Sequence, residues 1–234
     1  VPPGTELGFY ETWKEKRLNW HLALGLGAEN YKFHDHEKLA HYANAAVDIE
    51  FKFPFGFKEL EGIHSRTDFD LSAHEKHSGR KLQYFDAERN ENYVPYVVET
   101  SVGLDRLFLA IFSNCLKDEV LEDGSERTVL SLPPALAPVK AAILPLMKKD
   151  GLGEYGEKIF NDLKYDFNMI YEDKDSIGKR YRRQDAIGTP FCITIDHDSL
   201  TDNTVTLRDR DTMKQERVAV ADLRRIIDEK TNFR

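Results

Sequence analysis

Residues 93–106 read Tyr93-Val-Pro-Tyr-Val-Val-Glu-Thr-Ser-Val-Gly-Leu-Asp-Arg106, and this stretch determines how the first half of the chain folds. Its residues up to 102 are rich in β-branched side chains, which predicts a strand over 93–102. From residue 104 onward, apolar side chains recur at helical spacing, which predicts a helix over 104–116. Gly103 lies between the two and lets the backbone come close to a bound group. The sequence therefore predicts a strand that turns directly into a helix.

The corner between this strand and this helix carries side chains suited to binding. Glu99 and Ser101 point to the same face of the strand, because side chains alternate along it. A carboxylate beside a hydroxyl suits a small ammonium group. Arg106 suits a phosphate or a planar ring, through its fork of donors and its cation–π stacking. The alternative is that Asp105 only stabilises the helix N-terminus and that Arg106 is solvated.

The remainder of the first half has the pattern of an antiparallel sheet with helices laid on it. A helix with two glycines after it is expected over 6–26, with Trp13, Arg17, Trp20 and Leu24 on one face. Residues 47–53 alternate between apolar and charged side chains, which is typical of a half-buried strand. The further expected elements are strands over 58–64 and 82–85, a helix over 68–77 and a short helical turn over 37–42.

The pattern changes after residues 119–127, which are charged, contain glycine and are expected to form a linker. Beyond them strands alternate with helices, which predicts a compact α/β domain with a mixed sheet. The expected domains are thus 1–126 and 127–234, and the fold class of the whole is α+β. The elements expected after the linker are apolar segments at 129–132 and 140–146, strands over 167–171, 191–195, 204–208 and 217–220, and helices over 153–165, 176–187 and 221–230.

The composition of the 234 residues excludes several classes of protein. Hydrophobic residues make up 41% of the chain, so it has material for packed cores and is not disordered. No apolar run is long enough to cross a membrane, and the N-terminus lacks the features of a signal peptide. It also lacks an initiator Met, so we expect a chain that begins inside a longer protein or has been processed. Cys115 and Cys192 are expected to be buried thiols in a cytosolic protein.

The net charge of −8 is unevenly distributed. Residues 1–127 hold the whole acidic excess, and the remainder is balanced. A nucleic acid, if one binds, is therefore expected to favour local basic clusters in the second half.

The glycine, apolar residue, acid and arginine at 103–106 resemble the end of motif 3 of class II aminoacyl-tRNA synthetases. Further stretches, in order and at consistent spacing over nearly the whole chain, resemble glycyl-tRNA synthetases of the homodimeric type. These stretches are VDIEFKFPFG (47–56), ELEGI (59–63), RTDFDL (66–71), YVPYVVETSVGLDR (93–106), LPPALAP (132–138) and DSIGKRYRRQDAIGTP (175–190).

The resemblance implies that residues 1–126 are the C-terminal portion of a class II catalytic domain, with motif 3 at 99–112. It implies that residues 127–234 are an anticodon-binding domain. Motifs 1 and 2 of the family lie upstream of this region and are not visible, so half an active site is expected. The chain alone is therefore expected not to activate glycine. The resemblance also implies that the full-length protein is a homodimer, whose contacts lie largely in that upstream part.

The resemblance also implies roles for individual residues. Glu99 and Arg106 would be catalytic, with Arg106 packed on the adenine and facing the phosphates. The backbone of 100–103 would shape a pocket too small for a side chain, and Glu59 or Glu99 would approach Mg²⁺; no other metal ligand is assigned. Glycine would be bound by Glu99, Thr100, Ser101, Val102 and Gly103; ATP would be bound by Glu59, Leu60, Gly103, Leu104, Asp105 and Arg106. The alternative for Glu59 and Arg66 is an ion pair on the face of a strand.

The implied reaction has two steps. The carboxylate of glycine attacks the α-phosphorus of ATP, and a terminal ribose hydroxyl of tRNA-Gly then attacks the adenylate carbonyl. Catalysis would rest on positioning and on stabilising phosphate charge, and a closed pocket suffices to exclude larger amino acids. The alternative is a non-catalytic tRNA- or partner-binding protein on the same scaffold; the presence of Glu99, Ser101, Gly103 and Arg106 favours the enzyme.

A basic cluster in the second half is a candidate for binding tRNA. It consists of Lys179, Arg180, Arg182 and Arg183, with Tyr181 among them. The alternative is a solvated basic helix face that is paired with nearby acids such as Asp173 and Asp175. Arg208 and Arg210 are compatible with either a tRNA contact or a local ion pair. The histidines lack an HExxH pattern or a cysteine partner, so no structural metal site is expected; they include His34, His36, His41, His64, His74 and His77.

Overall fold

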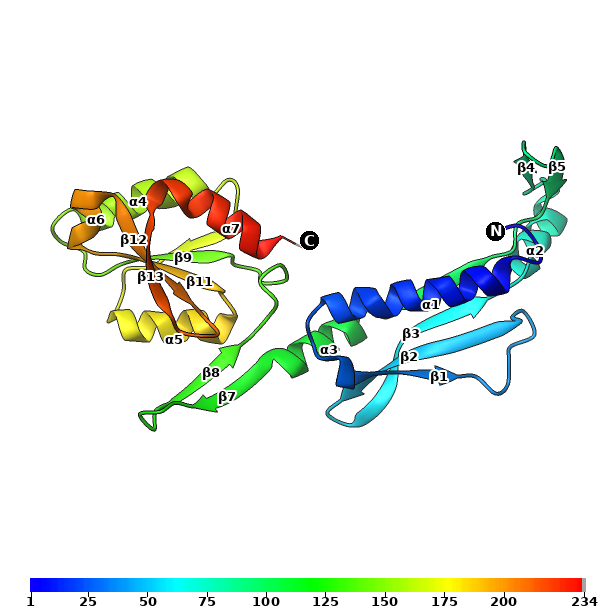
Figure 1. Ribbon diagram of the computed structural model, residues 1–234, viewed down its shortest axis with the longest axis horizontal. Helices are drawn as coiled ribbons and strands as arrows, with labels where there is room; N and C mark the ends of the chain where they lie inside the picture. Colours follow the sequence, from blue (N-terminus) through cyan, green and yellow to red (C-terminus); the bar gives the residue numbers. More distant parts are fainter. Residues whose placement is uncertain (233–234) are drawn as a thin grey trace. The chain divides into compact units, whose positions relative to one another are not determined.

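The computed structural model describes residues 1–232, and the chain divides into two compact units, Val1–Ser113 and a second unit that begins at Asn114. The first unit is built on an antiparallel sheet and the second on a mixed sheet, so the expected α+β fold is confirmed. Because the positions of the two units relative to each other are not determined, each is described by itself (Figure 1).

The first unit is a four-stranded antiparallel sheet in the order β1-β2-β3-β6, with helix α1 lying along one face (Figure 1). A separate two-stranded sheet, β4-β5, follows helix α2. The strands are β1 (Tyr31–Asp35), β2 (Ala45–Phe53), β3 (Gly56–Ser65), β4 (Tyr84–Asp86), β5 (Glu91–Tyr93) and β6 (Val98–Val102); the helices are α1 (Glu6–Ala23), the 3₁₀ turn η1 (Ala28–Asn30), α2 (Phe69–Ser78) and α3 (Leu104–Cys115).

The register of the sheet separates an apolar face from a polar one. Val47, Ile49 and Ile63 are completely buried and lie on the face that α1 covers. Along β6, Thr100 pairs with Ile63 and therefore shares that covered face. Glu99 and Ser101 alternate with Thr100 and so lie on the opposite, open face.

Four expectations for this unit need correction. The expected strand over 93–102 is interrupted: β5 ends at Tyr93, residues 94–97 form no strand, and β6 begins at Val98. Residues 37–42 form no helix, and the polar residues before them form the edge strand β1, which pairs with β2. Of the expected strand over 82–85, only Tyr84 and Phe85 are in a strand, and this strand belongs to the small β4-β5 hairpin and not to the main sheet. In α1, Trp20 is 42% exposed while His21 is completely buried. The helix is turned in this way because His21 contacts a charged side chain in the sheet, as described below.

The second unit is a five-stranded mixed sheet in the order β10-β9-β11-β12-β13. Strands β10, β9 and β11 are parallel, and β12 and β13 are antiparallel to their neighbours. The strands are β7 (Leu116–Val120), β8 (Glu126–Leu130), β9 (Ala141–Pro145), β10 (Met169–Tyr171), β11 (Phe191–Ile195), β12 (Thr204–Asp209) and β13 (Gln215–Ala219); the helices are α4 (Leu152–Leu163), α5 (Ile177–Ile187), α6 (His197–Asp202), the 3₁₀ turn η2 (Val220–Asp222) and α7 (Leu223–Thr231).

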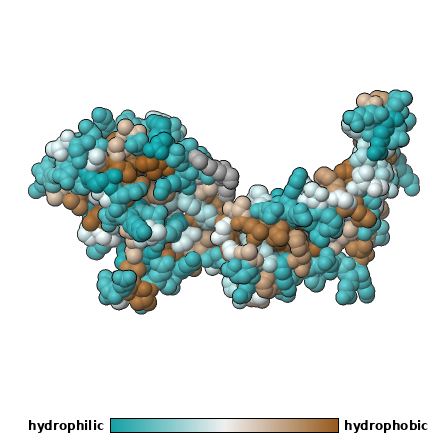
Figure 2. Space-filling model, in the orientation of Figure 1, coloured by the Kyte–Doolittle hydropathy of each residue, from teal (hydrophilic) through white to brown (hydrophobic). Residues whose placement is uncertain are grey.

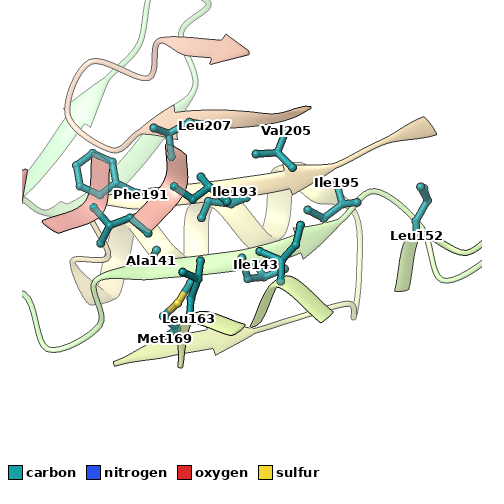
Figure 3. Packing of buried hydrophobic residues seen from close by; sticks show 13 residues of the cluster. Ala141, Ile143, Leu152, Leu163, Met169, Phe191, Ile193, Ile195, Val205 and Leu207 are labelled. Atoms are coloured by element: carbon teal, nitrogen blue, oxygen red, sulfur yellow. The ribbon is translucent and has the colours of Figure 1, made fainter. Parts of the chain in front are cut away.

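Helices cover both faces of this sheet (Figure 1). On one face, Ile143, Ile193 and Leu207 pack with residues of α4 and α7 in the main core of the unit (Figure 3). On the other face, Leu144 and Cys192 pack against α5. Both cysteines are buried and free, as expected.

The expected linker at 119–127 is instead the middle of a β-hairpin, β7-β8, in the second unit. Arg127 of β8 is buried, and its guanidinium donates to Asp185 of α5 at 3.2 Å and to the carbonyl of Arg210 at 2.8 Å. These bonds attach the hairpin to the second unit. The boundary between the compact units therefore falls between Ser113 and Asn114, ahead of the expected one after residue 126.

Within residues 1–232, no helix combines the length and the apolar character that crossing a lipid bilayer requires.

The packing of α4 against β9 predicts the effect of a single methyl group. A Cβ at Gly156 would lie 2.9 Å from Pro145 Cγ and 3.4 Å from Ile143 Cγ2. We therefore expect Gly156→Ala to lower the free energy of unfolding of the second unit by about 1–3 kcal/mol. Calorimetric unfolding measures this change. Gly178→Ala in α5 is the control, because nothing lies within 4 Å of its added Cβ; an equal loss in both variants would contradict the prediction.

Candidate functional site

The open face of the first sheet presents Glu99 and Ser101 from β6, as their alternation predicted. The Glu99 side chain is 34% exposed, and its Oε1 accepts a hydrogen bond from Arg66 at 2.7 Å. Ser101 is exposed. The strand thus offers a carboxylate and a hydroxyl to solvent on one surface, an arrangement that suits a small ammonium group.

Arg66 holds Glu99 in place from the end of β3. Its guanidinium donates to both oxygens of Asp70 in α2, at 2.7 and 3.1 Å, and stacks 4.1 Å above the ring of Tyr42. The hydrogen bonds that Arg66 donates to Asp70 and to Glu99 raise the pKa of Arg66, and the bond that Asp70 accepts from Arg66 lowers the pKa of Asp70. The expected ion pair of Glu59 and Arg66 is replaced by two others: Arg66 pairs with Glu99 and Asp70, and Glu59 pairs with Arg106. One partner of Arg66 is thus the candidate glycine ligand.

The floor of this face is built around Gly62, which lies directly opposite Ser101. A Cβ at this position would lie 2.9 Å from His64 Cε1 and 3.5 Å from Asp48 Oδ1. The His64 ring leans over Gly62, and its Nδ1 lies 3.6 Å from Glu99 Oε1. A residue larger than glycine at 62 would displace His64 from beside Glu99.

Glu61, behind the site, is a residue that the sequence analysis missed. Its side chain is completely buried on the covered face of the sheet. It accepts hydrogen bonds from Arg17 at 2.5 and 2.9 Å, pairs with His21 Nε2 at 2.7 Å and accepts a bond from the hydroxyl of Thr100. Thr100 lies between Glu99 and Ser101, so this buried carboxylate ties β6 to α1 directly beneath the candidate site. An acidic residue in the middle of a buried strand was the available signal.

Burial alone raises the pKa of Glu61, but the hydrogen bonds from His21, Arg17 and Thr100 outweigh it and lower the pKa to about 2. The carboxylate is therefore charged throughout the neutral range, and its partners are what make its burial tolerable.

The corner after β6 carries Arg106 in the first turn of α3. Its guanidinium donates to the carbonyl of Glu59 at 2.7 Å and lies 3.4 Å from Glu59 Oε2. Both side chains are about half exposed. They line a cavity of about 330 Å³ together with Phe53, Phe55, Lys58 and Leu109. The structure thus brings together Glu59 and Arg106, which the resemblance assigned to ATP.

The other residues expected in the site are arranged in different ways. Thr100 and Val102 direct their side chains to the covered face, so only their backbone faces the open side. Leu60 is buried. Leu104 is 79% exposed and belongs, with Phe108 and Phe112, to an apolar strip of α3 that lies open to solvent (Figure 2).

Among residues 1–232, no group of three or more histidine, cysteine or acidic side chains is arranged to hold a metal ion. A magnesium ion keeps several waters and takes one or two carboxylates plus substrate phosphates. Glu59, half exposed beside Arg106, fits such a shared role.

The basic cluster of α5 is only partly open to a ligand. Arg180 is buried, and its guanidinium donates to the carbonyls of Pro145 and Glu172 at 2.7 and 3.0 Å. The expectation of a tRNA contact is therefore corrected for Arg180, because its donors stabilise the ends of two strands. Arg183 pairs with Glu172 and Asp175, whereas Lys179 is exposed and Arg182 is partly exposed.

Arg208 and Arg210 are structural. Arg208 donates to both oxygens of the buried Asp185, at 2.7 and 3.0 Å. Arg210 donates to the carbonyls of Gly188 and Leu132, both at 2.7 Å. Of the two possibilities open for this pair, an internal role is the one observed.

Residues 140–230 match the model of the anticodon-binding domain family. This range includes every strand of the mixed sheet and most of α7. This segment of the chain is therefore similar to anticodon-binding domains, and it is preceded by an antiparallel sheet whose open face holds the candidate site.

Similarity to individual proteins is more specific than the match to the domain family. The chain is 55% identical over 219 residues to the glycine–tRNA ligase of Chlorobaculum tepidum, covering 93% of this chain and 46% of that protein. It is 53% identical to the glycine–tRNA ligase of Macrococcus caseolyticus and 51% to that of Geobacillus thermodenitrificans, each over 233 residues, 99% of this chain and 50% of the relative. The chain is thus similar to part of each of these glycine–tRNA ligases, and it spans about half the length of the curated relatives it matches.

The lowered pKa of Glu61 predicts how acid affects the first unit. A carboxylate with a folded-state pKa of about 2, against an ordinary 4.5, stabilises the fold above pH 4.5 and loses this contribution as the pH falls toward 2. The loss amounts to about 3 kcal/mol. We expect Glu61→Gln to have a lower free energy of unfolding than the wild type at pH 7. Below pH 4.5 the difference in free energy of unfolding between the two proteins should shrink.

Urea unfolding followed by tryptophan fluorescence measures this, because both tryptophans, Trp13 and Trp20, lie in α1. Glu15→Gln, on the exposed side of α1, is the control. A difference between wild type and Glu61→Gln that stays constant from pH 6 to pH 3 would contradict the assignment.

Proposed function

We propose that this chain supplies the amino-acid and adenine side of the active site of a glycine–tRNA ligase, together with its anticodon-binding domain. The observation that carries the proposal is the pairing of Glu99 with Arg66 on the open sheet face, next to a corner where Arg106 is held by Glu59. The homology to glycine–tRNA ligase supports it.

Glu99 and Ser101 would bind the ammonium group of glycine. Arg66 bonds to Oε1 of Glu99, and within residues 1–232 the structure gives no bond to Oε2, which is left for the ligand. Arg66 is shared with Asp70, so two carboxylates surround one guanidinium and the group retains a negative charge. That charge attracts the ammonium, while Arg66 fixes the direction of the carboxylate.

Glu59, Gly103 and Arg106 would bind ATP, with the backbone of Leu60, Leu104 and Asp105 contributing. The Arg106 guanidinium offers a flat surface for the adenine ring and donors for the phosphates. Magnesium, if it enters with ATP, would offset phosphate charge beside Glu59. These residues would orient the α-phosphorus for attack by the glycine carboxylate, which yields glycyl-adenylate and pyrophosphate.

The partner of the second unit would be tRNA-Gly, whose terminal ribose hydroxyl accepts glycine from the adenylate. Lys179, Arg182 and Arg183 are the members of the α5 cluster that remain candidates for contact with it. The complete protein would act as a homodimer, as the resemblance implies. It would act in the cytoplasm, because translation takes place there.

The relatives' remaining length would complete the catalytic site. The open apolar strip of α3 at Leu104, Phe108 and Phe112 is consistent with a surface that further protein covers. We expect a polypeptide limited to these 234 residues to show no glycine-dependent ATP–pyrophosphate exchange. The same assay on a protein of the relatives' full length is the positive control. Robust exchange by the shorter polypeptide would refute this division of the site.

Removing the charge of Glu99 tests the assignment of the ammonium ligand. In a protein of full length, we expect Glu99→Gln to lower kcat/KM for glycine by about 10–100-fold, mostly through KM, because a bond to a charged group is lost. The KM for ATP should stay within about twofold of the wild type, since the residues assigned to ATP are not changed. Glu15→Gln on α1 is the matched control. An unchanged KM for glycine in Glu99→Gln would remove Glu99 from the site.

A further inference from the structure

The segment 76–85, which joins α2 to the β4-β5 hairpin, is basic within an otherwise acidic unit. Its sequence is KHSGRKLQYF, with three cations, one histidine and no acid. Lys76, Arg80 and Lys81 are all exposed. Within residues 1–232 none of these three side chains takes part in an ion pair, so their charge is free for a ligand.

The same segment presents aromatic rings to solvent. Tyr84 is 57% exposed and Phe85 is 53% exposed. Tyr84 is tilted against Tyr93 at a ring distance of 5.7 Å, which leaves its other face open. The hairpin is a two-stranded sheet of its own and lies beyond the end of α2 (Figures 1 and 2).

Three of the acidic side chains near the segment are already engaged. Glu75 accepts a hydrogen bond from the backbone of Leu82 at 2.6 Å, which shapes the start of the hairpin. Asp86 and Glu91 each lie 3.8 Å from Arg89 at the turn. The acids near the hairpin tip are thus partly neutralised locally, and the net positive charge remains on the 76–85 segment.

We propose that the 76–85 segment binds single-stranded RNA, namely the unpaired 3′ end of the tRNA acceptor arm. Cations beside exposed aromatic rings match the two features of such a strand, its phosphates and its unstacked bases. An acidic peptide would satisfy the cations but would leave the rings without a stacking partner. The inference rests on the proposed function, because it names the part of the tRNA that this unit receives.

The position of the segment relative to the candidate site supports this choice. Arg66 bonds both to Glu99 in the site and to Asp70 in the first turn of α2. The 76–85 segment begins at Lys76 in the last turn of α2, six residues or about 9 Å along the helix from Asp70. An RNA strand held along Lys76, Arg80 and Tyr84 would thus have its terminal ribose close to Glu99.

Binding of two RNA probes to the intact 234-residue chain tests the proposal. One probe is a hairpin with the acceptor stem of tRNA-Gly and its unpaired 3′ end, and the other is the anticodon stem-loop. For the triple variant Lys76→Gln, Arg80→Gln, Lys81→Gln, we expect the affinity for the acceptor hairpin to fall about tenfold or more. The slope of log K against log salt should decrease by about 2, because three phosphate contacts to a single strand are lost.

Two further variants separate stacking from charge. Tyr84→Ala with Phe85→Ala should weaken binding of the acceptor hairpin about tenfold with little change in its salt slope, since stacking is not ionic. Lys16→Gln, Lys38→Gln, Lys52→Gln removes three exposed cations elsewhere in the same unit and is the matched control. It should leave both affinities within about twofold, as no phosphate contact is removed. Tryptophan fluorescence verifies that each variant is folded.

The outcomes distinguish this inference from the proposed function. Affinity of the triple variant equal to that of wild type, or an unchanged affinity when the unpaired 3′ end is deleted from the probe, would overturn the inference. Binding of the anticodon stem-loop alone by the wild type would also overturn it, while the proposed function would stand. Absence of binding to either RNA would count against the proposed function itself.

Discussion

A carboxylate removed from water must be surrounded by donors, and both units of this chain are organised around that constraint. In the first unit Glu61 is completely buried, and Arg17, His21 and Thr100 supply its hydrogen bonds. These three partners come from α1 and β6, so the single charge fixes the rotation of the helix and the position of the strand. The exposed Trp20 follows from this, because His21 must face the sheet.

The candidate site is a consequence of this anchoring. Side chains alternate along β6, so a strand that is held through Thr100 on its covered face must present Glu99 and Ser101 on its open face. Arg66 repeats the arrangement on the open side, where it is shared between Glu99 and Asp70. The two networks hold one strand from opposite faces, so a ligand meets a carboxylate whose direction is already set. This preorganisation reduces the conformational cost of binding.

Local pattern was sufficient to predict the strand-to-helix corner at Gly103, the alternation of Glu99 with Ser101 and most of the regular elements. It was insufficient where the outcome depended on contacts between distant residues. Glu61 gave only the weak signal of an acid in a buried strand, because the donors that make its burial possible lie in α1. Residues 119–127 resemble a linker in composition, and it is the bond from Arg127 to Asp185 that places them in a hairpin of the second unit.

Contacts between distant residues also limit what can be inferred about function from the charged residues in the sequence. Asp185 is the second unit's counterpart of Glu61, and its burial engages Arg127 and Arg208. Arg180 and Arg210 are engaged by backbone carbonyls. A count of cations therefore overstates what this unit can offer to an RNA, because much of its positive charge is internal. The first unit is acidic overall, yet the cations of its 76–85 segment are exposed and unpaired within the described residues. An arginine or a lysine is available to bind a phosphate only where the folded chain has not already supplied it with an ion-pair or hydrogen-bond partner.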